Sequence, residues 1–472
     1  MGYKQIFVPG VSNTKSIEQK NTLHPAQHHW NVTMVDMKAL IKLMKELEHQ
    51  VARCVRCGMC QAVCPLFEQT GRESDVARGK LALLDGLMQE MFKNPKGVSN
   101  RLDRCLLCGS CAANCPSGVS VLEIFIKARA TLSGFMGLSP SKKVILRGML
   151  AHPETFDWVL AWGSKFQKIF TRPANDLIGT SCARFVSPLL SRRHFLPLAP
   201  VPFHQMVTQI STGVGHSGLK VAFYVGCLID KIFPRIGVET VSVLNQHQVG
   251  VFMPKTQGCC GIPAISAGDT ETFNRLVRYN LNLFDSEDFD YLVTSCATCT
   301  STIKKIWPMM LVDKQGDVKA KARRLSEKTM DINQFLVLIT GLKKSEIIKR
   351  GEAITITYHD PCHLKKTLGV SSEPRALIQT NSRYCFKEMP GADACCGLGG
   401  SFNLQHYELS SDIGMRKRNH IKISGSSTVA TGCPACMIQL SDMLSRSGDH
   451  IAVKHPIEIY AEAIKLSGSG IF

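Results

Sequence analysis

Two runs of cysteines with identical internal spacing stand out in the N-terminal part of the chain. One extends from Cys54 to Cys64 and the other from Cys105 to Cys115, and both read C-x2-C-x2-C-x3-C-P. This spacing places thiolates around a cubane [4Fe–4S] cluster, with the fourth cysteine of each run bound to the other cluster. Zinc or disulfides are the alternative, but zinc sites usually combine two separated C-x2-C pairs. We therefore expect two [4Fe–4S] clusters. The predicted ligands are Cys54, Cys57, Cys60 and Cys115 for one cluster and Cys105, Cys108, Cys111 and Cys64 for the other.

Ten further cysteines form two similar sets in the second half of the chain. Each set has a single cysteine, an adjacent pair and a C-x2-C pair, and these landmarks repeat at offsets of 135, 136 and 137 residues. So constant an offset indicates a duplicated domain. The sets are Cys227, Cys259, Cys260, Cys296 and Cys299, and then Cys362, Cys395, Cys396, Cys433 and Cys436.

Five thiolates in each set are one more than a cubane cluster needs. Either each set holds a non-cubane cluster with five sulfur ligands, or four cysteines bind and one thiol is spare. Zinc in one or both repeats is a third interpretation, because four thiolates also suit zinc. A glycine follows each adjacent pair, and glycine lets the backbone adopt positive φ and approach a metal assembly closely.

Two histidines flank the first cysteine of the second set, in the segment Tyr-His-Asp-Pro-Cys-His. We take His359 and His363 as candidate catalytic residues, which would donate protons beside the metal site or tune its reduction potential. The alternative is a pair of hydrogen-bonded residues in a turn after a strand. Tyr224 and Leu228 occupy the equivalent places in the first repeat. Proton-coupled chemistry would therefore belong to the second repeat.

The elements that must position these cysteines differ between the two halves. Apolar residues at helical spacing predict helices from near Thr33, over Asp75–Met91 and over Val119–Ala130. In the first repeat we predict strands at Phe223–Gly226, Val249–Met253 and Tyr291–Thr294, and a helix at Thr270–Phe284. The cysteines of each repeat then follow predicted strands, where open α/β sheets place ligand sites.

We therefore expect a chain of mixed α+β and α/β class. A helical two-[4Fe–4S] ferredoxin-type domain precedes two tandem α/β cysteine-rich domains. The predicted boundaries are an N-terminal arm at 1–32, the ferredoxin-type domain at 33–135, a helical connector and proline-rich linker at 136–218, and the two cysteine-rich domains at 219–345 and 346–472.

The connector contains aromatic residues at every fourth position. Trp158, Trp162, Phe166 and Phe170 predict a helix from Asp157 to Phe170 with an aromatic edge. That edge is either buried core, which we favour, or a surface that meets a partner or a membrane. The two remaining cysteines are expected to be buried small hydrophobes. They are Cys182 and Cys385.

Composition restricts the compartment and the partners. The 472 residues include 20 cysteines, grouped at ligand spacings, which favours a reducing compartment. The formal net charge of +18 favours an acidic protein partner or an anionic lipid surface. Nucleic acid is not expected, because no basic run interleaves with aromatics in a recognised module. With no secretory signal or apolar 20-residue span, we expect a cytoplasmic protein, with peripheral contact to the inner membrane as an open alternative.

The paired cysteine sets resemble the CCG domains of heterodisulfide-reductase-type proteins. A two-cluster ferredoxin domain followed by two CCG domains is similar to the iron–sulfur subunits of glycolate oxidase and D-lactate dehydrogenase, over about residues 50–465. The resemblance implies special [4Fe–4S] clusters in the CCG domains, or zinc in one of them.

The same resemblance implies a function in electron transfer. No G-x-G-x-x-G fingerprint for a flavin or nicotinamide follows a predicted strand. We therefore expect the iron–sulfur subunit of a glycolate or D-lactate oxidoreductase, in which a separate FAD-linked subunit oxidises the substrate and electrons continue to a quinone or another carrier. One alternative is a heterodisulfide-reductase-like subunit that reduces a disulfide at the CCG clusters. Another is a metal-bound assembly scaffold.

Overall fold

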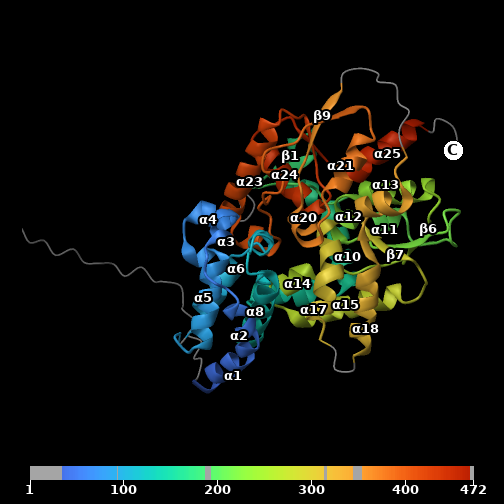
Figure 1. Ribbon diagram of the computed structural model, residues 1–472. Coiled ribbons are helices and arrows are strands. Elements are labelled where there is room, and N and C mark those ends of the chain that lie inside the picture. Colours follow the sequence, from blue (N-terminus) through green and yellow to red (C-terminus); the bar gives the residue numbers. More distant parts are fainter. Residues whose placement is uncertain (1–33, 93, 186–192, 313–315, 344–352, 468–472) are drawn as a thin grey trace, which may run out of the picture.

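The computed structural model describes residues 34–92, 94–185, 193–312, 316–343 and 353–467 (Figure 1). The predicted N-terminal arm at 1–32 and the boundary between the two repeats, at residues 345 and 346, lie outside these ranges. Within them, none of the helices is both long enough and apolar enough to span a bilayer.

The N-terminal part is helical and is drawn in blue to teal in Figure 1. Its helices bury leucine, methionine and valine side chains, among them Leu40, Leu84 and Leu132, which are fully buried. The predicted helices at Asp75–Met91 and Val119–Ala130 correspond to α5 and α8. The elements are α1 (Met34–Met44), η1 (Lys45–Leu47), α2 (Glu48–Ala52), α3 (Met59–Ala62), α4 (Pro65–Thr70), η2 (Glu73–Asp75), α5 (Ala77–Met88), α6 (Lys96–Asp103), α7 (Ser110–Ala113) and α8 (Val121–Met136).

The connector contains strands that the sequence did not predict. Its elements are α9 (Pro140–Lys143), η3 (Val144–Leu150), α10 (Pro153–Phe170), β1 (Thr171–Asn175), β2 (Thr180–Ala183), β3 (His194–Phe195) and α11 (Phe203–Met206). Strands β1, β2 and β3 form an antiparallel sheet. Tertiary contact explains this sheet better than local propensity: the backbone N–H of His194 donates to Asp442 Oδ1 at 2.9 Å, which ties β3 to the second repeat.

Each repeat is built on a parallel sheet, and the two sheets share one strand order. The orders are β4-β6-β5-β7-β8 and β10-β9-β11-β12, so that β5 corresponds to β9 and β7 to β11. Strand β4 is an added antiparallel edge. The strands are β4 (Ile210–Ser211), β5 (Lys220–Phe223), β6 (Gly250–Met253), β7 (Tyr291–Thr294), β8 (Thr329–Asp331), β9 (Ile354–Tyr358), β10 (Tyr384–Phe386), β11 (Thr428–Ala430) and β12 (Ala452–Lys454).

Helices join and cover these strands. In the first repeat they are α12 (Cys227–Lys231), α13 (Pro234–Gln246), α14 (Ile262–Ser266), α15 (Thr270–Phe284), α16 (Ala297–Ser301), η4 (Thr302–Ile306), α17 (Trp307–Met310), α18 (Asp317–Lys328), α19 (Ile332–Phe335) and η5 (Leu336–Thr340). In the second they are α20 (Cys362–Leu368), α21 (Ser372–Gln379), α22 (Ser401–Gln405), α23 (Tyr407–Ile423), α24 (Pro434–Arg446) and α25 (Pro456–Ser467).

The central strand of each sheet is the point at which the chain changes direction. From β5 the chain goes to β6 on one side and returns to β7 on the other, and β9, β10 and β11 repeat this path. Ligand sites of open α/β sheets lie beyond the carboxyl ends of strands at such switch points. The register makes Tyr224 and His359 equivalent, since their backbone N–H groups donate to Val293 O at 2.9 Å and Ala430 O at 2.8 Å.

Two expectations about burial were wrong. The aromatic edge of α10 is not core: the exposed fraction is 68% for Trp158 and 59% for Trp162. The helical spacing of the aromatic residues predicts a helix, but it does not show whether another element packs against their face. Cys385 is also exposed, because it lies on β10, the edge strand of its sheet, and Cys182 is only partly buried.

Candidate metal centres

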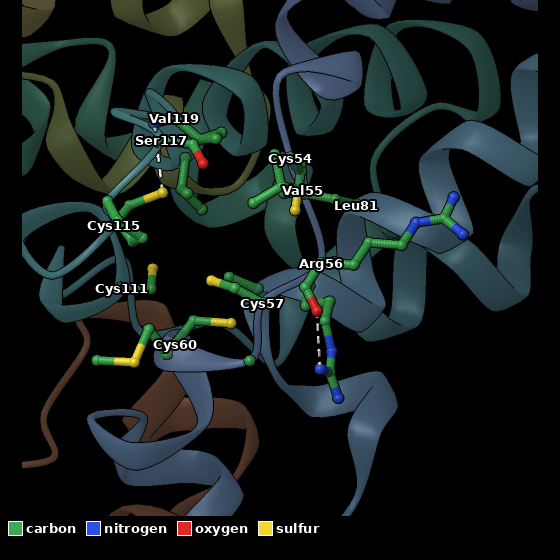
Figure 2. A pocket seen from close by; sticks show the side chains of 16 residues that line it. Cys54, Val55, Arg56, Cys57, Cys60, Leu81, Cys111, Cys115, Ser117 and Val119 are labelled. Atoms are coloured by element: carbon green, nitrogen blue, oxygen red, sulfur yellow. Dashed lines mark hydrogen bonds between the residues drawn. The ribbon is translucent and has the colours of Figure 1, made fainter.

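The first cysteine cavity lies in the N-terminal helical part (Figure 2). The side chains of Cys54, Cys57, Cys60 and Cys115 line it together, and Cys111, which also lines the second cavity, lies between Cys115 and Cys60 (Figure 2). These are the four cysteines assigned to one cluster, drawn from both runs.

The second cavity adjoins the first. Cys64, Cys105, Cys108 and Cys111 line it, so the structure again brings together the four residues assigned to one cluster. Cys64 is the extended N-cap of α4, with a proline at the first helical position. The positive end of that helix therefore lies beside the cavity, and hydrogen bonds from the backbone N–H groups of Leu66 and Phe67 partly offset the effect of burial on the pKa of the Cys64 thiol.

The two loops that carry the cysteine triplets have the same unusual backbone. Arg56 and Leu107, each two residues after the first cysteine, have φ of 56° and 54°. Gly58 and Gly109, two residues further on, have φ of 88° and 75°. A left-handed conformation at a non-glycine residue costs about 1–3 kcal/mol, and such strain concentrates at functional sites. Its recurrence at matching positions indicates that both loops are shaped to wrap the same kind of group.

The electrostatics of these cavities favour a bound cation. Burial, together with the nearby Cys105 and Cys108, raises the pKa of the Cys64 thiol to about 11. Burial followed by the neighbouring cysteines also raises the pKa of Cys111 well above its ordinary value. Gathered thiolates repel one another in a desolvated site, and metal binding offsets this cost. The all-sulfur donor set and the paired loops fit iron–sulfur clusters, which transfer single electrons when bound.

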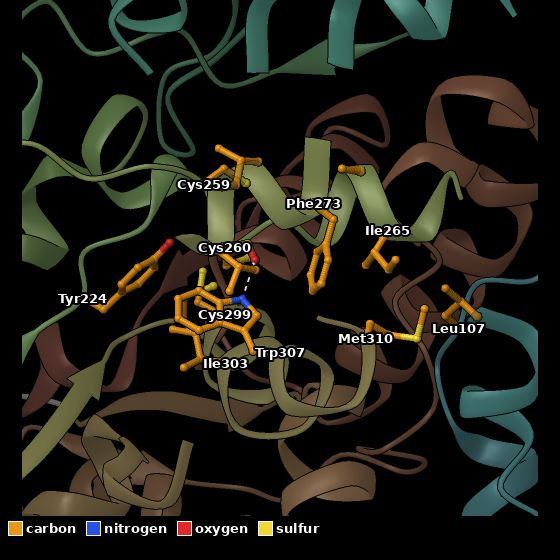
Figure 3. Close-up of a cluster of buried hydrophobic side chains, with 14 of the residues drawn as sticks. Leu107, Tyr224, Cys259, Cys260, Ile265, Phe273, Cys299, Ile303, Trp307 and Met310 are labelled. Atoms are coloured by element: carbon orange, nitrogen blue, oxygen red, sulfur yellow. Dashed lines mark hydrogen bonds between the residues drawn. The ribbon is translucent and has the colours of Figure 1, made fainter. Parts of the chain in front are cut away.

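The third site lies at the carboxyl ends of the strands in the first repeat (Figure 3). Cys227 begins α12 after β5, Cys259 and Cys260 follow β6, and Cys296 caps α16 after β7. The sulfur atoms of Cys227 and Cys259 are 4.0 Å apart. The indole N–H of Trp307 donates to the carbonyl of Cys260 at 2.8 Å and fixes the adjacent pair.

The glycine after each adjacent pair is structurally required. Gly261 has φ of 90°, and a Cβ there would lie 2.8 Å from the ring of Phe273. Gly397 has φ of 94°, and a Cβ there would lie 2.6 Å from the carbonyl oxygen of Ser410. Both repeats therefore use glycine to turn the chain directly behind the two sulfurs.

The fourth site repeats this arrangement in the second repeat. The sulfur atoms of Cys396 and Cys436 are 3.4 Å apart, and the N–H of Gly397 donates to Cys395 Sγ at 3.4 Å. Cys433 caps α24, just as Cys296 caps α16. Cys362 begins α20 and completes the predicted set.

The second cavity and the fourth site are adjacent. Hydrogen bonding to Cys395 is the largest cause that raises the pKa of Cys108, and both side chains lie in one buried cluster. Lys366 Nζ donates to Ser110 Oγ at 2.6 Å across the same junction. An ion pair between Arg416 and Glu68 also joins the two domains.

The fourth site is also adjacent to the third site. Thr298 Oγ1 lies 3.3 Å from Cys433 Sγ, and the N–H of Ala297 donates to Gly432 O at 3.0 Å. Hydrogen bonding to Cys296 is the largest cause that lowers the pKa of Cys433 well below its ordinary value. The four cysteine sites therefore form one continuous row.

The two candidate histidines occupy different places. His359 is fully buried, and its Nδ1 lies 3.2 Å from the carbonyl oxygen of Ala392. Burial, reinforced by the charge of Lys417, lowers the pKa of its imidazole to about 3. His363 lies where three domains meet, with Nδ1 at 3.2 Å from Thr298 Oγ1 and Nε2 at 3.4 Å from Leu107 O.

Sequence reasoning missed several residues around these sites. Arg129 is buried and donates to the carbonyls of Leu102 and Cys105 beside the second cavity. Lys417 is buried beside the fourth site, and Thr298 bridges two sites. A charged residue within a mostly apolar helix face, as at Arg129, is the one signal that could have marked them.

Comparison with known proteins agrees with these domains. A 4Fe-4S dicluster domain matches residues 50–119, and a Cysteine-rich domain matches residues 221–304 and again 356–441. The "Probable glycolate oxidase iron-sulfur subunit" of Bacillus subtilis is 26% identical over 426 residues, which is 88% of this chain and 94% of that protein. A fumarate reductase (CoM/CoB) subunit of Methanothermobacter marburgensis is 26% identical over 400 residues, 84% of this chain and 68% of that protein.

A shorter relative has a similar degree of identity. The "Lactate utilization protein A 2" of Bacillus cereus is 28% identical over 250 residues, which is 52% of this chain and 99% of that protein. The chain therefore contains a 4Fe-4S dicluster domain followed by two cysteine-rich CCG domains, and it is similar over most of its length to the "Probable glycolate oxidase iron-sulfur subunit" of Bacillus subtilis.

Proposed function

We propose that this chain is the electron-transfer subunit of a glycolate or D-lactate oxidoreductase. A separate FAD-linked subunit would oxidise the 2-hydroxy acid, and the electrons would leave to a quinone or another carrier. The observation that carries the proposal is the contact between Cys108 and Cys395, which links the ferredoxin-type sites to the cysteine-rich sites. The names of the relatives from Bacillus subtilis and Bacillus cereus support the choice of substrate class.

The residues of the row would perform three tasks. The predicted cysteines would hold two [4Fe–4S] clusters and, in each repeat, a further iron–sulfur cluster. The buried surroundings of Cys108, Cys395, Cys433 and Cys296 would exclude water between neighbouring sites. Close approach of the sites would let electrons pass without any movement of the domains.

The two ends of the row differ in ways that suggest a direction. Cys57 is exposed, so the first cavity reaches the surface, where a flavoprotein could deliver electrons. At the other end Cys227 begins α12, and Lys231 of α12 pairs with Asp157 of α10 at 2.8 Å. The final site therefore lies behind the helix that carries the exposed aromatic stripe.

We propose that this stripe docks on an anionic membrane, where a quinone is available. Trp158, Trp162 and Phe170 are exposed along α10, together with Lys165 and Lys168. Aromatic side chains flanked by lysines are typical of helices that lie in the bilayer interface. The net charge of +18 has the sign that anionic lipids attract.

Purification of the native protein under anaerobic conditions tests the function. We expect a flavin-containing partner to co-purify and the complex to reduce its iron–sulfur centres when glycolate or D-lactate is added. Reduction of a disulfide by the isolated chain with reduced viologen, and no flavoprotein partner, would instead support the heterodisulfide-reductase-like alternative. Zinc in both cysteine-rich sites would contradict the electron-transfer role of those domains.

Vesicle binding tests the membrane contact. A double variant, Trp158→Ser with Trp162→Ser, should bind phosphatidylglycerol vesicles at least about tenfold more weakly, a loss of about 1.4 kcal/mol. Ile423→Ser is the matched control, because Ile423 is also exposed but lies on the second repeat. Equal binding by all three proteins, or equal binding to uncharged phosphatidylcholine, would refute this contact.

A further inference from the structure

The two cysteine-rich sites differ in one buried side chain. Tyr224 and His359 are equivalent by register, as their matching backbone hydrogen bonds to Val293 and Ala430 establish. In the first repeat the hydroxyl of Tyr224 donates to the backbone carbonyl of Gly258 at 2.7 Å. Its hydrogen is therefore already bound by a protein group. In the described part of the second repeat, the Nε2 atom of His359 has no hydrogen-bond partner.

The hydrogen bond of His359 fixes which nitrogen carries the hydrogen. A carbonyl oxygen can only accept, so Nδ1 must donate to Ala392 O across the 3.2 Å between them. In the neutral ring Nε2 then presents a lone pair. This atom is buried and has no hydrogen-bond partner among the residues that the structure describes.

His359 also belongs to a group of potential metal ligands. One ring nitrogen of His359 and the sulfur atoms of Cys396 and Cys436 all lie within 4.8 Å of one another. Histidines that bind metals usually donate their other ring N–H to a carbonyl or carboxylate, which orients the ring and sets the tautomer. His359 has this arrangement before any metal is considered.

His455 provides an internal comparison, since it is also fully buried beside Cys433. Its Nδ1 accepts from the N–H of Ile457 at 3.2 Å, so the hydrogen must reside on Nε2. The tautomer is opposite to that of His359 and leaves no lone pair for a metal. Proximity to the cysteines is therefore not enough, and the hydrogen-bond pattern distinguishes the two histidines.

We propose that His359 Nε2 is a metal ligand of the second cysteine-rich site, which makes that site a mixed sulfur–nitrogen centre and the first an all-sulfur one. The inference rests on the proposed function only in that the second site must hold a metal. It extends that function by making the two CCG sites chemically inequivalent.

A second difference acts in the same direction. Lys417 is buried and donates to the carbonyls of Gly391 and Ala392 next to the second site. Asn280 has the matching place on α15, 137 residues earlier, and contacts Gly258 and Cys259. A neutral nitrogen ligand and a buried ammonium both reduce the negative charge of a centre, which raises its reduction potential. The cysteine-rich site of the second repeat should therefore accept an electron before that of the first repeat.

Pulsed EPR of the reduced, anaerobically prepared protein tests the ligand. We expect a strong nitrogen hyperfine coupling that changes on labelling with 15N-histidine, and that disappears in His359→Tyr, which introduces the residue of the first repeat. His363→Ala is the matched control, because both nitrogens of His363 have partners, and it should keep the coupling. The labelled native protein supplies the answer even if His359→Tyr fails to fold.

The outcomes separate this inference from the proposed function. A metal-loaded second site without histidine coupling in the labelled protein would overturn the ligand and leave the function standing. If the second site holds zinc, X-ray absorption at the zinc edge replaces EPR, and a purely sulfur shell would overturn the ligand. No metal at that site would contradict the proposed cofactor itself.

Discussion

Replacement of Arg129 by methionine should loosen the junction between the ferredoxin-type domain and the first repeat. The guanidinium donates to Ser266 O at 2.8 Å in the first repeat, and to Leu102 O at 2.5 Å and Cys105 O at 2.7 Å beside the second cavity. Methionine fills similar volume but removes all three bonds. Leu102 O keeps the backbone N–H of Cys105, whereas Ser266 O and Cys105 O lose the guanidinium as partner, at about 1–3 kcal/mol each. Because the variant also avoids the cost of burying the guanidinium, we expect the free energy of unfolding to fall by a net amount of about 3–5 kcal/mol.

The loss is measurable as bleaching of iron–sulfur absorbance in urea under anaerobic conditions. With a slope of about 2 kcal/mol per molar urea, the midpoint should fall by about 2 M. Arg147→Met is the matched control, because Arg147 of the connector also pairs with the first repeat, through Asp269 and Glu271, but its side chain is 43% exposed. Asp269 is buried but keeps its hydrogen bonds from Thr272, and ion pairs to a partly exposed arginine contribute about 0–1 kcal/mol. Equal midpoints for the two variants would refute the role assigned to Arg129.

Three further variants test the sites and the fold. Gly261→Ala should lower metal occupancy of the third site, whereas Gly316→Ala, also at positive φ but with open space around it, should not; metal analysis of both compares them. Burial raises the pKa of Asp331 from 3.8 to about 7, so native stability should fall as pH rises from about 4 to 7. Asp331→Asn removes that slope and should raise the unfolding free energy at pH 8 by up to about 4 kcal/mol, and a variant less stable than the native protein at pH 8 would contradict this. Cys385, exposed on β10, should take up maleimide in the native protein, and Cys385→Ser should lose the label without losing metal.

Spacing predicted the grouping of the cysteines because ligand geometry leaves few alternatives. The motif alone predicts that the fourth cysteine of each run binds with the triplet of the other run. In the structure Cys115 lines the cavity of the first triplet and Cys64 lines the cavity of the second. The strands at Tyr291–Thr294 and the helix at Thr270–Phe284 were also predicted with their observed bounds, since both have clear apolar periods.

Features that depend on tertiary contact could not be predicted. The β1-β2-β3 sheet owes its place to the second repeat, as the bond from His194 to Asp442 illustrates. The order of the four sites could not be predicted, because it depends on the contact between Cys108 and Cys395, which are far apart in the sequence. Trp158 and Trp162 are exposed because none of the described elements covers that face of α10. The spacing of apolar residues in a sequence does not show which helix faces are covered.

Rapid-freeze EPR of the native complex after addition of its 2-hydroxy acid tests the row of sites most directly. We predict that the ferredoxin-type centres are reduced first, then the cysteine-rich site of the second repeat and then that of the first repeat. Cys108→Ser should leave the exposed centre at Cys57 reducible and block reduction of both cysteine-rich sites. Normal reduction of the cysteine-rich sites in that variant would contradict the row as the path of the electrons.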